Sequence, residues 1–409
     1  MKIKIFLFCL FVISTKIFKL DFLTGIQLKL MYYPLLIFML VKIINKGSFF
    51  YKRLSFKFPI LAMFSCILLS SIPCYIYYNQ NIPDSLVASF NFAFPFLIYF
   101  YLHASKVPES DLLKVFLAMS LLTVSIQIFQ QFYPEYAIFG VSEDKTEEEF
   151  AMRNNLYRYR INFSGIYTFP ILFYLWFKIM KKYTLKNVFL IVLFLTSIYL
   201  ALTRQVLATT AICLLISVLL YSKHMKKSLL FIYIVLFGVI IAYNFDSLFS
   251  SLVEKSINEI NNEDYIRYKS FEYFSVESRA TPLHALLGHG IPRGGSSYDD
   301  FINMLAETYH YYSSDVGFVG AAYKYGYIYV ILFYLVQFVC LWKYRKYTPS
   351  YIAITMIGMI IYSIMLFMIN QPIGAMVWAS MLYIIDLHKY KSPLRLNYNL
   401  TNVTNTKKS

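Results

Sequence analysis

The sequence has little charge and lacks the motifs of the common soluble enzymes. Only 15% of its 409 residues are charged and 58% are hydrophobic, against about 25% and roughly 45–50% in an average soluble protein. Its five cysteines lie in apolar segments without metal-ligand spacing, so we expect neither a disulfide nor a metal site. No HExxH or CxxC pattern and no nucleophile elbow occurs. These absences argue against a zinc hydrolase, a dithiol redox enzyme and a serine hydrolase.

The charge that is present is strongly basic, with 38 Lys and Arg against 22 Asp and Glu. A net charge of +16 would indicate nucleic-acid binding only if a soluble fold offered a basic face. No such fold is visible in the sequence, so we expect no nucleic-acid partner. Membrane topology explains the lysines better, with contact to anionic lipid headgroups as a by-product.

Apolar runs recur along nearly the whole chain and are long enough to cross a bilayer of about 30 Å as helices. They predict an all-α polytopic membrane protein, a single transmembrane domain over residues 1–409 with about twelve spans. The first run begins like a signal peptide but lacks a small-residue cleavage site, so we interpret it as the first span. The expected spans lie near residues 3–20, 26–45, 58–78, 86–103, 111–132, 163–180, 187–203, 205–222, 228–245, 314–342, 350–369 and 373–388.

Lysine and arginine gather in alternate short loops, and such loops are held on the cytoplasmic side. The basic loops follow the even-numbered spans, whereas the short loops "NQNIPDS" and "NQP" on the other side carry no lysine or arginine. This pattern places both chain ends in the cytoplasm, including a tail at 389–409. It places two polar segments outside: a loop at 133–162, and a large, partly helical loop at 246–313 between the ninth and tenth spans.

Arginines on the external side oppose this bias and need an explanation. Arg160 closes the first external loop, and Arg267, Arg279 and Arg293 lie in the large loop. Arg204 lies at the junction of two spans, where it either snorkels to the headgroups or faces a water-filled cavity and binds phosphate through its planar guanidinium. Several arginines without a carboxylate cluster would bind a diphosphate-linked substrate and offset the charge of its leaving group without a metal.

The stretch "HALLGHGIPRGGSSYDD" at residues 284–300 is rich in glycine, which suits either a plain surface turn or a loop that cradles a ligand. We expect His289 within it to be exposed and to exchange protons near neutral pH. The two aspartates that end the stretch are a weak candidate for a metal site. Further along, His310 and Asp315 stand where the chain re-enters the membrane. Asp315 either caps the next helix or acts as a carboxylate at the mouth of the site.

The layout and four short patches resemble the O-antigen polymerase and O-antigen ligase superfamily of bacterial membrane glycosyltransferases. In each of the first three patches one arginine matches the family's: Arg160 in "RINFSGIYTFP", Arg204 in "LTRQVLA", and Arg267 in "IRYKSFEYFSVESRATPLHALLGHG". The fourth, "SDVGFVGAAYKYG", resembles the polymerases' segment with an aspartate at the start of the tenth span. The short separation of His310 from Gly317 favours a polymerase over a ligase.

The resemblance implies an enzyme that polymerises lipid-linked oligosaccharide repeat units into O-antigen, capsule or exopolysaccharide, on the external face of the bacterial cytoplasmic membrane. The donor is a growing glycan on undecaprenyl diphosphate, and the acceptor is one repeat unit on a second undecaprenyl diphosphate. A regulator of chain length is a further partner that it allows, and no cofactor or metal is expected. In the implied site, the diphosphate is bound by Arg160, Arg204 and Arg267. The base that accepts the acceptor proton is His310 or Asp315. The lid residues that contact the sugars are Arg279, His289 and Arg293.

Three other functions stay open. A ligase would move the finished polymer onto another acceptor, such as lipid A core. A flippase or transporter of lipid-linked sugars should carry charged residues from several spans along a central path, whereas the charges of this chain lie at the outer rim. A receptor or scaffold without chemistry would leave the external arginines unexplained.

Overall fold

The computed structural model describes a chain that is almost entirely helical, over residues 2–15, 25–51, 54–133, 152–153, 156–157, 164–201, 203–221 and 266–405. The described strands, β1 (Met152–Arg153) and β2 (Leu156–Tyr157), form a two-residue antiparallel pair. The predicted helical fold class is therefore confirmed for this part of the chain.

The expected apolar segments of the first half are found as helices. Their bounds are α1 (Lys2–Ser14), α2 (Gly25–Asn45), α3 (Lys57–Leu69), α4 (Ser71–Tyr78), α5 (Ile82–Ala93), α6 (Ile98–Ser105), α7 (Glu109–Phe132), α8 (Ser164–Lys181), α9 (Leu185–Leu200) and α10 (Arg204–Tyr221). Two short 3-10 turns also occur: η1 (Ser48–Phe50) precedes α3, and η2 (Phe94–Leu97) directly adjoins α6. The expected span at 228–245 lies outside the described residues.

The second half contains α12 (Ile266–Glu277), α13 (Pro282–Leu287), α14 (Ser297–Thr308), α15 (Gly317–Tyr325), α16 (Tyr327–Trp342), α17 (Ser350–Ser363), η5 (Met368–Asn370) and α18 (Pro372–Asn405). One expectation is wrong here, because the apolar run 314–342 forms two helices instead of one. Gly326 separates them with φ 82° and ψ 164°, a backbone conformation open to glycine alone.

Three helical segments of the described chain are long and apolar enough to cross a membrane. They are Lys57–Tyr78, which joins α3 and α4, Ile82–Ser105, which joins α5 to α6, and Glu109–Phe132, which is α7. Several other described helices are apolar but shorter. The full set of about twelve spans therefore stays a prediction.

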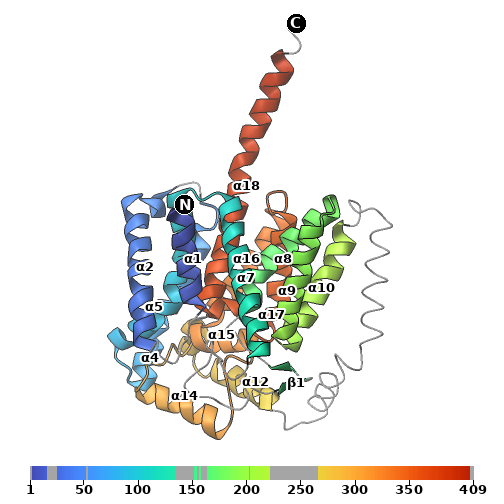
Figure 1. Ribbon diagram of the computed structural model, residues 1–409. Coiled ribbons are helices and arrows are strands. Elements are labelled where there is room, and N and C mark those ends of the chain that lie inside the picture. The colour runs from blue at the N-terminus through green and yellow to red at the C-terminus, as the bar shows by residue number, and fades with distance from the viewer. Residues whose placement is uncertain are drawn as a thin grey trace.

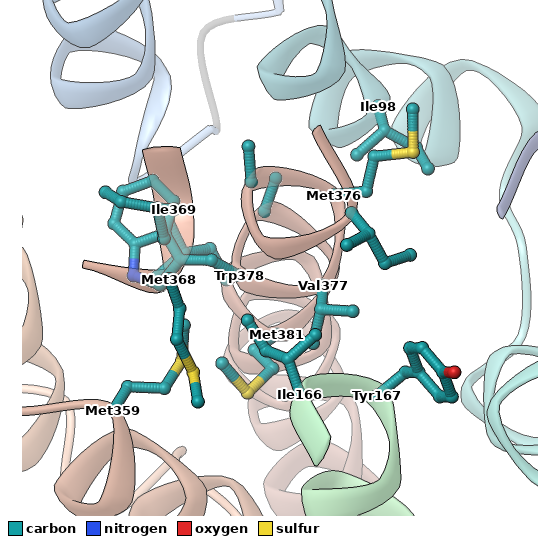
Figure 2. Packing of buried hydrophobic residues seen from close by; sticks show 14 of the residues in the cluster. Ile98, Ile166, Tyr167, Met359, Met368, Ile369, Met376, Val377, Trp378 and Met381 are labelled. Atoms are coloured by element: carbon teal, nitrogen blue, oxygen red, sulfur yellow. The ribbon is translucent and has the colours of Figure 1, made fainter. Parts of the chain in front are cut away.

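Helix α18 forms the centre of the bundle. Residues 375–385 are each 0% exposed, as expected for a helix that is apolar on all its faces. Figure 2 shows Met376 beside Ile98 of α6, and Met381 beside Ile166 of α8, which both pack on α18. Helix α18 thus forms a central part of the core, in contact with α1, α5, α6, α7 and α8.

A row of polar side chains on α7 joins it to α8 and α9. Thr123 Oγ1 lies 2.5 Å from the hydroxyl of Tyr167 on α8, and Ser197 on α9 donates to Gln127 Oε1 at 2.5 Å. Thr123 and Gln127 are 0% exposed. Hydrogen bonds of this kind hold helices together where apolar contact alone gives little specificity.

Both chain ends lie at the same end of the bundle, and α12 and α14 lie at the opposite end (Figure 1). Near the chain ends, the buried carboxylate of Asp386 on α18 accepts hydrogen bonds from the Tyr99 hydroxyl and from the Ser55 amide at 3.2 Å. His103 Nε2 lies 3.5 Å from the same oxygen. This polar cluster fixes α18 to α6 and to the chain that precedes α3.

Candidate functional site

Residues 266–316, here called the cap, contain α12, α13, α14 and the connecting turns at the end of the bundle away from the chain termini (Figure 1). The cap packs on α4 and on α15. It holds six of the eight residues that the sequence marks as site candidates. Arg160 lies outside the described residues, and α10 begins at Arg204, whose side chain also lies outside them.

His289 is the best-fixed polar side chain of the cap. Its Nε2 lies 2.9 Å from the backbone carbonyl of Glu277, and its Nδ1 lies 2.6 Å from the hydroxyl of Tyr78. Because a carbonyl only accepts hydrogen bonds, Nε2 must carry the proton, and the Tyr78 hydroxyl then donates to Nδ1. The ring is therefore held as one neutral tautomer between α12 and α4.

His289 also belongs to a ring stack of Tyr77, His284, His289 and Tyr323. Successive ring centroids lie 4.2, 3.7 and 4.2 Å apart. Burial, opposed by the bond to Glu277 and assisted by the neighbouring His284, lowers the pKa of His289 to about 3. Burial also lowers the pKa of His284. Both rings are thus neutral at pH 7.

Two glycines allow the chain around His289 to lie directly against other backbones. Gly288 has φ 74°, and a Cβ there would lie 2.4 Å from the carbonyl carbon of Lys324; one on Gly290 would lie 2.6 Å from the Ser70 oxygen. The amides of His289 and Gly290 donate to the carbonyls of Tyr323 and Lys324 at 2.6 and 3.0 Å. By contrast, a Cβ on Gly294 or Gly295 would meet no atom within 4 Å.

The expected exposure of His289 is therefore wrong, since its side chain is 1% exposed. The glycine-rich sequence suited a surface turn or a ligand-cradling loop, but the first two glycines serve close packing and only the last two lie in open space. The contact of His289 with a sugar stays a prediction. Because the side chain is buried in this structure, such a contact would have to pass through its neighbours. Arg279 and Arg293 are exposed, as contacts to a substrate outside the bundle would need to be.

The aspartates that end the glycine-rich stretch have a structural role at the start of α14. Ser296 Oγ accepts from the Asp299 amide at 3.2 Å, and Asp299 Oδ2 accepts from the Gly295 amide at 3.0 Å. This pattern is a helix N-cap. Among the described residues, no group of three His, Cys, Asp or Glu side chains comes together as metal ligands would.

His310 and Asp315 lie in the turn that connects α14 to α15. His310 is exposed and has φ 55°, which is strained for a residue with a side chain. Asp315 is partly buried, and its Oδ1 accepts from Ser314 Oγ at 3.1 Å. The interpretation of Asp315 as a helix cap is wrong, because Val316 is the N-cap of α15 and no side chain caps that helix.

Arg267 is brought to the same corner by the packing of α12 on α15. The ring of Phe271 lies 6.4 Å from that of Phe318, and the ring of Phe274 lies 4.8 Å from that of Tyr323. The two helices therefore run side by side in the same direction. Arg267 precedes Phe271 by about one turn on the same face, so it lies at the end of α15 where Asp315 is found.

Among the described residues, the cap arginines have no acidic partner. The ion pairs between described side chains, Lys4 and Lys114 with Asp111, His103 with Asp386, and His388 with Glu109, lie outside the cap. Within the described residues, Arg267, Arg279 and Arg293 have no carboxylate at ion-pair distance. Arg267 is partly buried and has no counter-ion among the described residues, and a cation of this kind is available to an anionic ligand.

Sequence reasoning missed the aromatic and amide partners that fix the cap. Tyr78 and Tyr298 stack at 4.0 Å, and Gln80 Oε1 accepts from the Arg293 amide and from Ser296 Oγ, both at 2.8 Å. The only signal was the cluster "CYIYYNQN" at the end of α4.

Acid should destabilise the cap through His289. A histidine with a folded pKa of about 3 binds protons more weakly than in the unfolded chain, where the pKa is about 6.5. The stability it contributes is therefore complete above pH 6.5 and is lost as the pH falls from about 6.5 to 3, on the order of 3 kcal/mol at pH 4. Thermal unfolding of the full chain at pH 7.5 and 4 measures this loss. His289→Gln should shrink the difference between the two pH values; an equal difference in both proteins would contradict the assignment.

Among the described residues, the cap thus presents arginines without an ion pair and, in the turn before α15, a histidine and a carboxylate. Such a site can hold an anionic leaving group and deprotonate a hydroxyl. The sequence matches no family model and no curated protein.

Proposed function

We propose that the protein polymerises lipid-linked oligosaccharide repeat units on the external face of the bacterial cytoplasmic membrane. The observation that carries the proposal is the cap at one end of a largely apolar bundle, which holds His310, Asp315 and arginines that have no acidic partner among the described residues. Diphosphate-linked substrates need such a set, because cations must offset the leaving group while a base accepts the acceptor proton.

The arrangement of the chain supports a membrane site of this kind. Three helical segments are long and apolar enough to span, and the chain ends lie opposite the cap (Figure 1). Both features agree with the orientation that the basic loops predict, with the termini in the cytoplasm and the cap outside. The remaining spans of the proposed set of about twelve, and both polar loops, belong to the same proposal.

The proposed reaction is a substitution at the anomeric carbon of the donor glycan. A hydroxyl of the acceptor repeat unit attacks this carbon and forms the new glycosidic bond. The bond from the carbon to the phosphate oxygen breaks, and undecaprenyl diphosphate leaves with the electron pair. Arg267, with Arg160 and Arg204, stabilises the diphosphate, and His310 or Asp315 accepts the hydroxyl proton.

Deletion of the gene, followed by gel analysis of the surface glycan, tests the proposal. We expect loss of the ladder of long chains while single repeat units remain attached to their acceptor, because attachment would need only the ligase. Loss of all attached glycan would instead indicate a ligase, and repeat units trapped inside the cell would indicate a flippase. Purified protein with lipid-linked repeats should also form polymer in EDTA, since arginines supply the positive charge.

A further inference from the structure

Lys324 on α15 is a cation that the proposed reaction does not use. It is the only charged residue between Val316 and Trp342, in a segment that is otherwise apolar. Its side chain is partly buried, and within the described residues no carboxylate lies at ion-pair distance and no acceptor bonds its ammonium. An ionisable residue in an apolar segment is costly and usually serves a function.

Helical geometry places Lys324 on a particular face of α15. Gly317, Gly320 and Lys324 share this face, since they are spaced by three and four residues. A Cβ on Gly317 would lie 2.2 Å from the Ile364 oxygen, and one on Gly320 would lie 1.7 Å from the Ser313 oxygen. The lysine face therefore looks toward the end of α17 and the turn that holds His310 and Asp315. Long helical side chains lean toward the N-terminus of their helix, so Lys324 leans toward that turn.

The end of α17 is also where α10 approaches. Cys213 of α10 lies 3.8 Å from the carbonyl oxygen of Ile354 on α17, and a Cβ on Gly358 would lie 3.0 Å from the Cys213 sulfur. Helix α10 begins at Arg204, two to three turns before Cys213. A Cβ on Gly358 would also lie 3.7 Å from Thr209, one turn nearer to Arg204, so the start of α10 lies toward the end of α17.

We propose that Lys324 binds a phosphate group of the lipid-linked substrate, from the side of the site opposite α12. The identity of the substrate rests on the proposed function. The ammonium has no counter-ion among the described residues, and its side chain leans toward the turn with His310 and Asp315. A phosphate group would supply the missing negative charge. Lys324 would approach the phosphate from the side of α15 that faces α17, and Arg267 from the side that faces α12.

A direct binding measurement tests whether Lys324 binds the phosphate, without relying on catalysis. Full-length protein in nanodiscs is titrated with undecaprenyl diphosphate, with inorganic diphosphate, and with phosphatidylglycerol as a bulk-headgroup probe. Lys324→Met should weaken the binding of undecaprenyl diphosphate about tenfold or more, as loss of a charged hydrogen bond does, whereas Lys324→Arg should keep most of it. The matched control is Lys343→Met, an exposed lysine that follows α16, and it should bind as the unmodified protein does.

The thermal stability of Lys324→Met provides a second test of the proposal. Removing an unpaired, partly buried cation should raise the midpoint of thermal unfolding by about 2–4 °C, so Lys324→Met is expected to be more heat-stable and weaker in binding. A lower midpoint would overturn the proposal, since it would mean that the lysine stabilises the fold through a partner of its own. Unchanged binding of undecaprenyl diphosphate in Lys324→Met would overturn it as well.

The probes separate the possible sources of phosphate. Undecaprenyl diphosphate should bind more tightly than phosphatidylglycerol, and inorganic diphosphate should compete with it. Equal binding of phosphatidylglycerol would assign the lysine to bulk headgroups and overturn the substrate assignment. Loss of undecaprenyl diphosphate binding in Lys324→Met, together with a normal glycan ladder in the deletion strain, would retain the phosphate site while rejecting polymerisation.

Discussion

Arg267→Lys is expected to slow polymer formation by roughly thirtyfold to several hundredfold. Lysine keeps the positive charge but loses the planar two-point contact that a guanidinium makes with phosphate. Loss of such a contact in the transition state is worth on the order of 2–4 kcal/mol. Purified protein with lipid-linked repeat units gives the rate, measured at matched protein concentration.

Arg345→Lys is the control for this substitution. Arg345 is exposed and lies just beyond α16, outside the cap, so the same chemical change should leave the rate unaltered. A normal rate for Arg267→Lys would remove Arg267 from the site and leave the diphosphate to Arg160 and Arg204. A loss in both variants would mean that the assay responds to lysine substitution in general.

Gly288→Ala is expected to destabilise the cap by about 3 kcal/mol or more. Gly288 has φ 74° and ψ −167°, a conformation that costs about 1–3 kcal/mol for other residues. The new Cβ would also meet the Lys324 backbone at 2.4 Å, which cannot give way as a flexible side chain could. The measurement is the thermal unfolding midpoint of the purified protein, read together with hydrogen exchange in residues 284–300.

Gly294→Ala is the matched change in the same stretch of sequence. Its Cβ would meet nothing within 4 Å, so both the midpoint and the exchange should stay close to those of the unmodified protein. Equal effects of the two substitutions would contradict the close packing of Gly288. Loss of stability in Gly288→Ala alone would confirm that the first half of the glycine-rich stretch is a packed element.

Hydropathy predicted the helices well because each one depends on a local property of the chain. The run expected at 111–132 is α7 at Glu109–Phe132, and the run at 163–180 is α8 at Ser164–Lys181. The break at Gly326 was missed because the residues on both sides are apolar. It is fixed by contact with α13, where a Cβ would lie 2.0 Å from the Leu286 oxygen.

The candidate site could be predicted only as a set of residue types. Unusual placement of arginines singled out Arg267, and the structure brings its helix beside the turn with Asp315. The burial of His289 could not be predicted, since its partners Tyr78 and Tyr323 are distant in the sequence and no periodicity links them. The same is true of Lys324, because the sequence shows one polar residue in an apolar run and only the structure shows that no described residue is its counter-ion.

The central place of α18 has a consequence for how the protein is made. This helix follows every other described helix in the chain, so the ribosome delivers the core last. Until residues 375–385 pack into the bundle, the faces of α6 and α8 that they cover must stay open or be held by other factors. The contacts that complete the core join residues that are far apart in sequence, and such contacts form slowly. Assembly of the bundle should therefore finish after synthesis, and a chain that stops before α18 should be a substrate for membrane proteases.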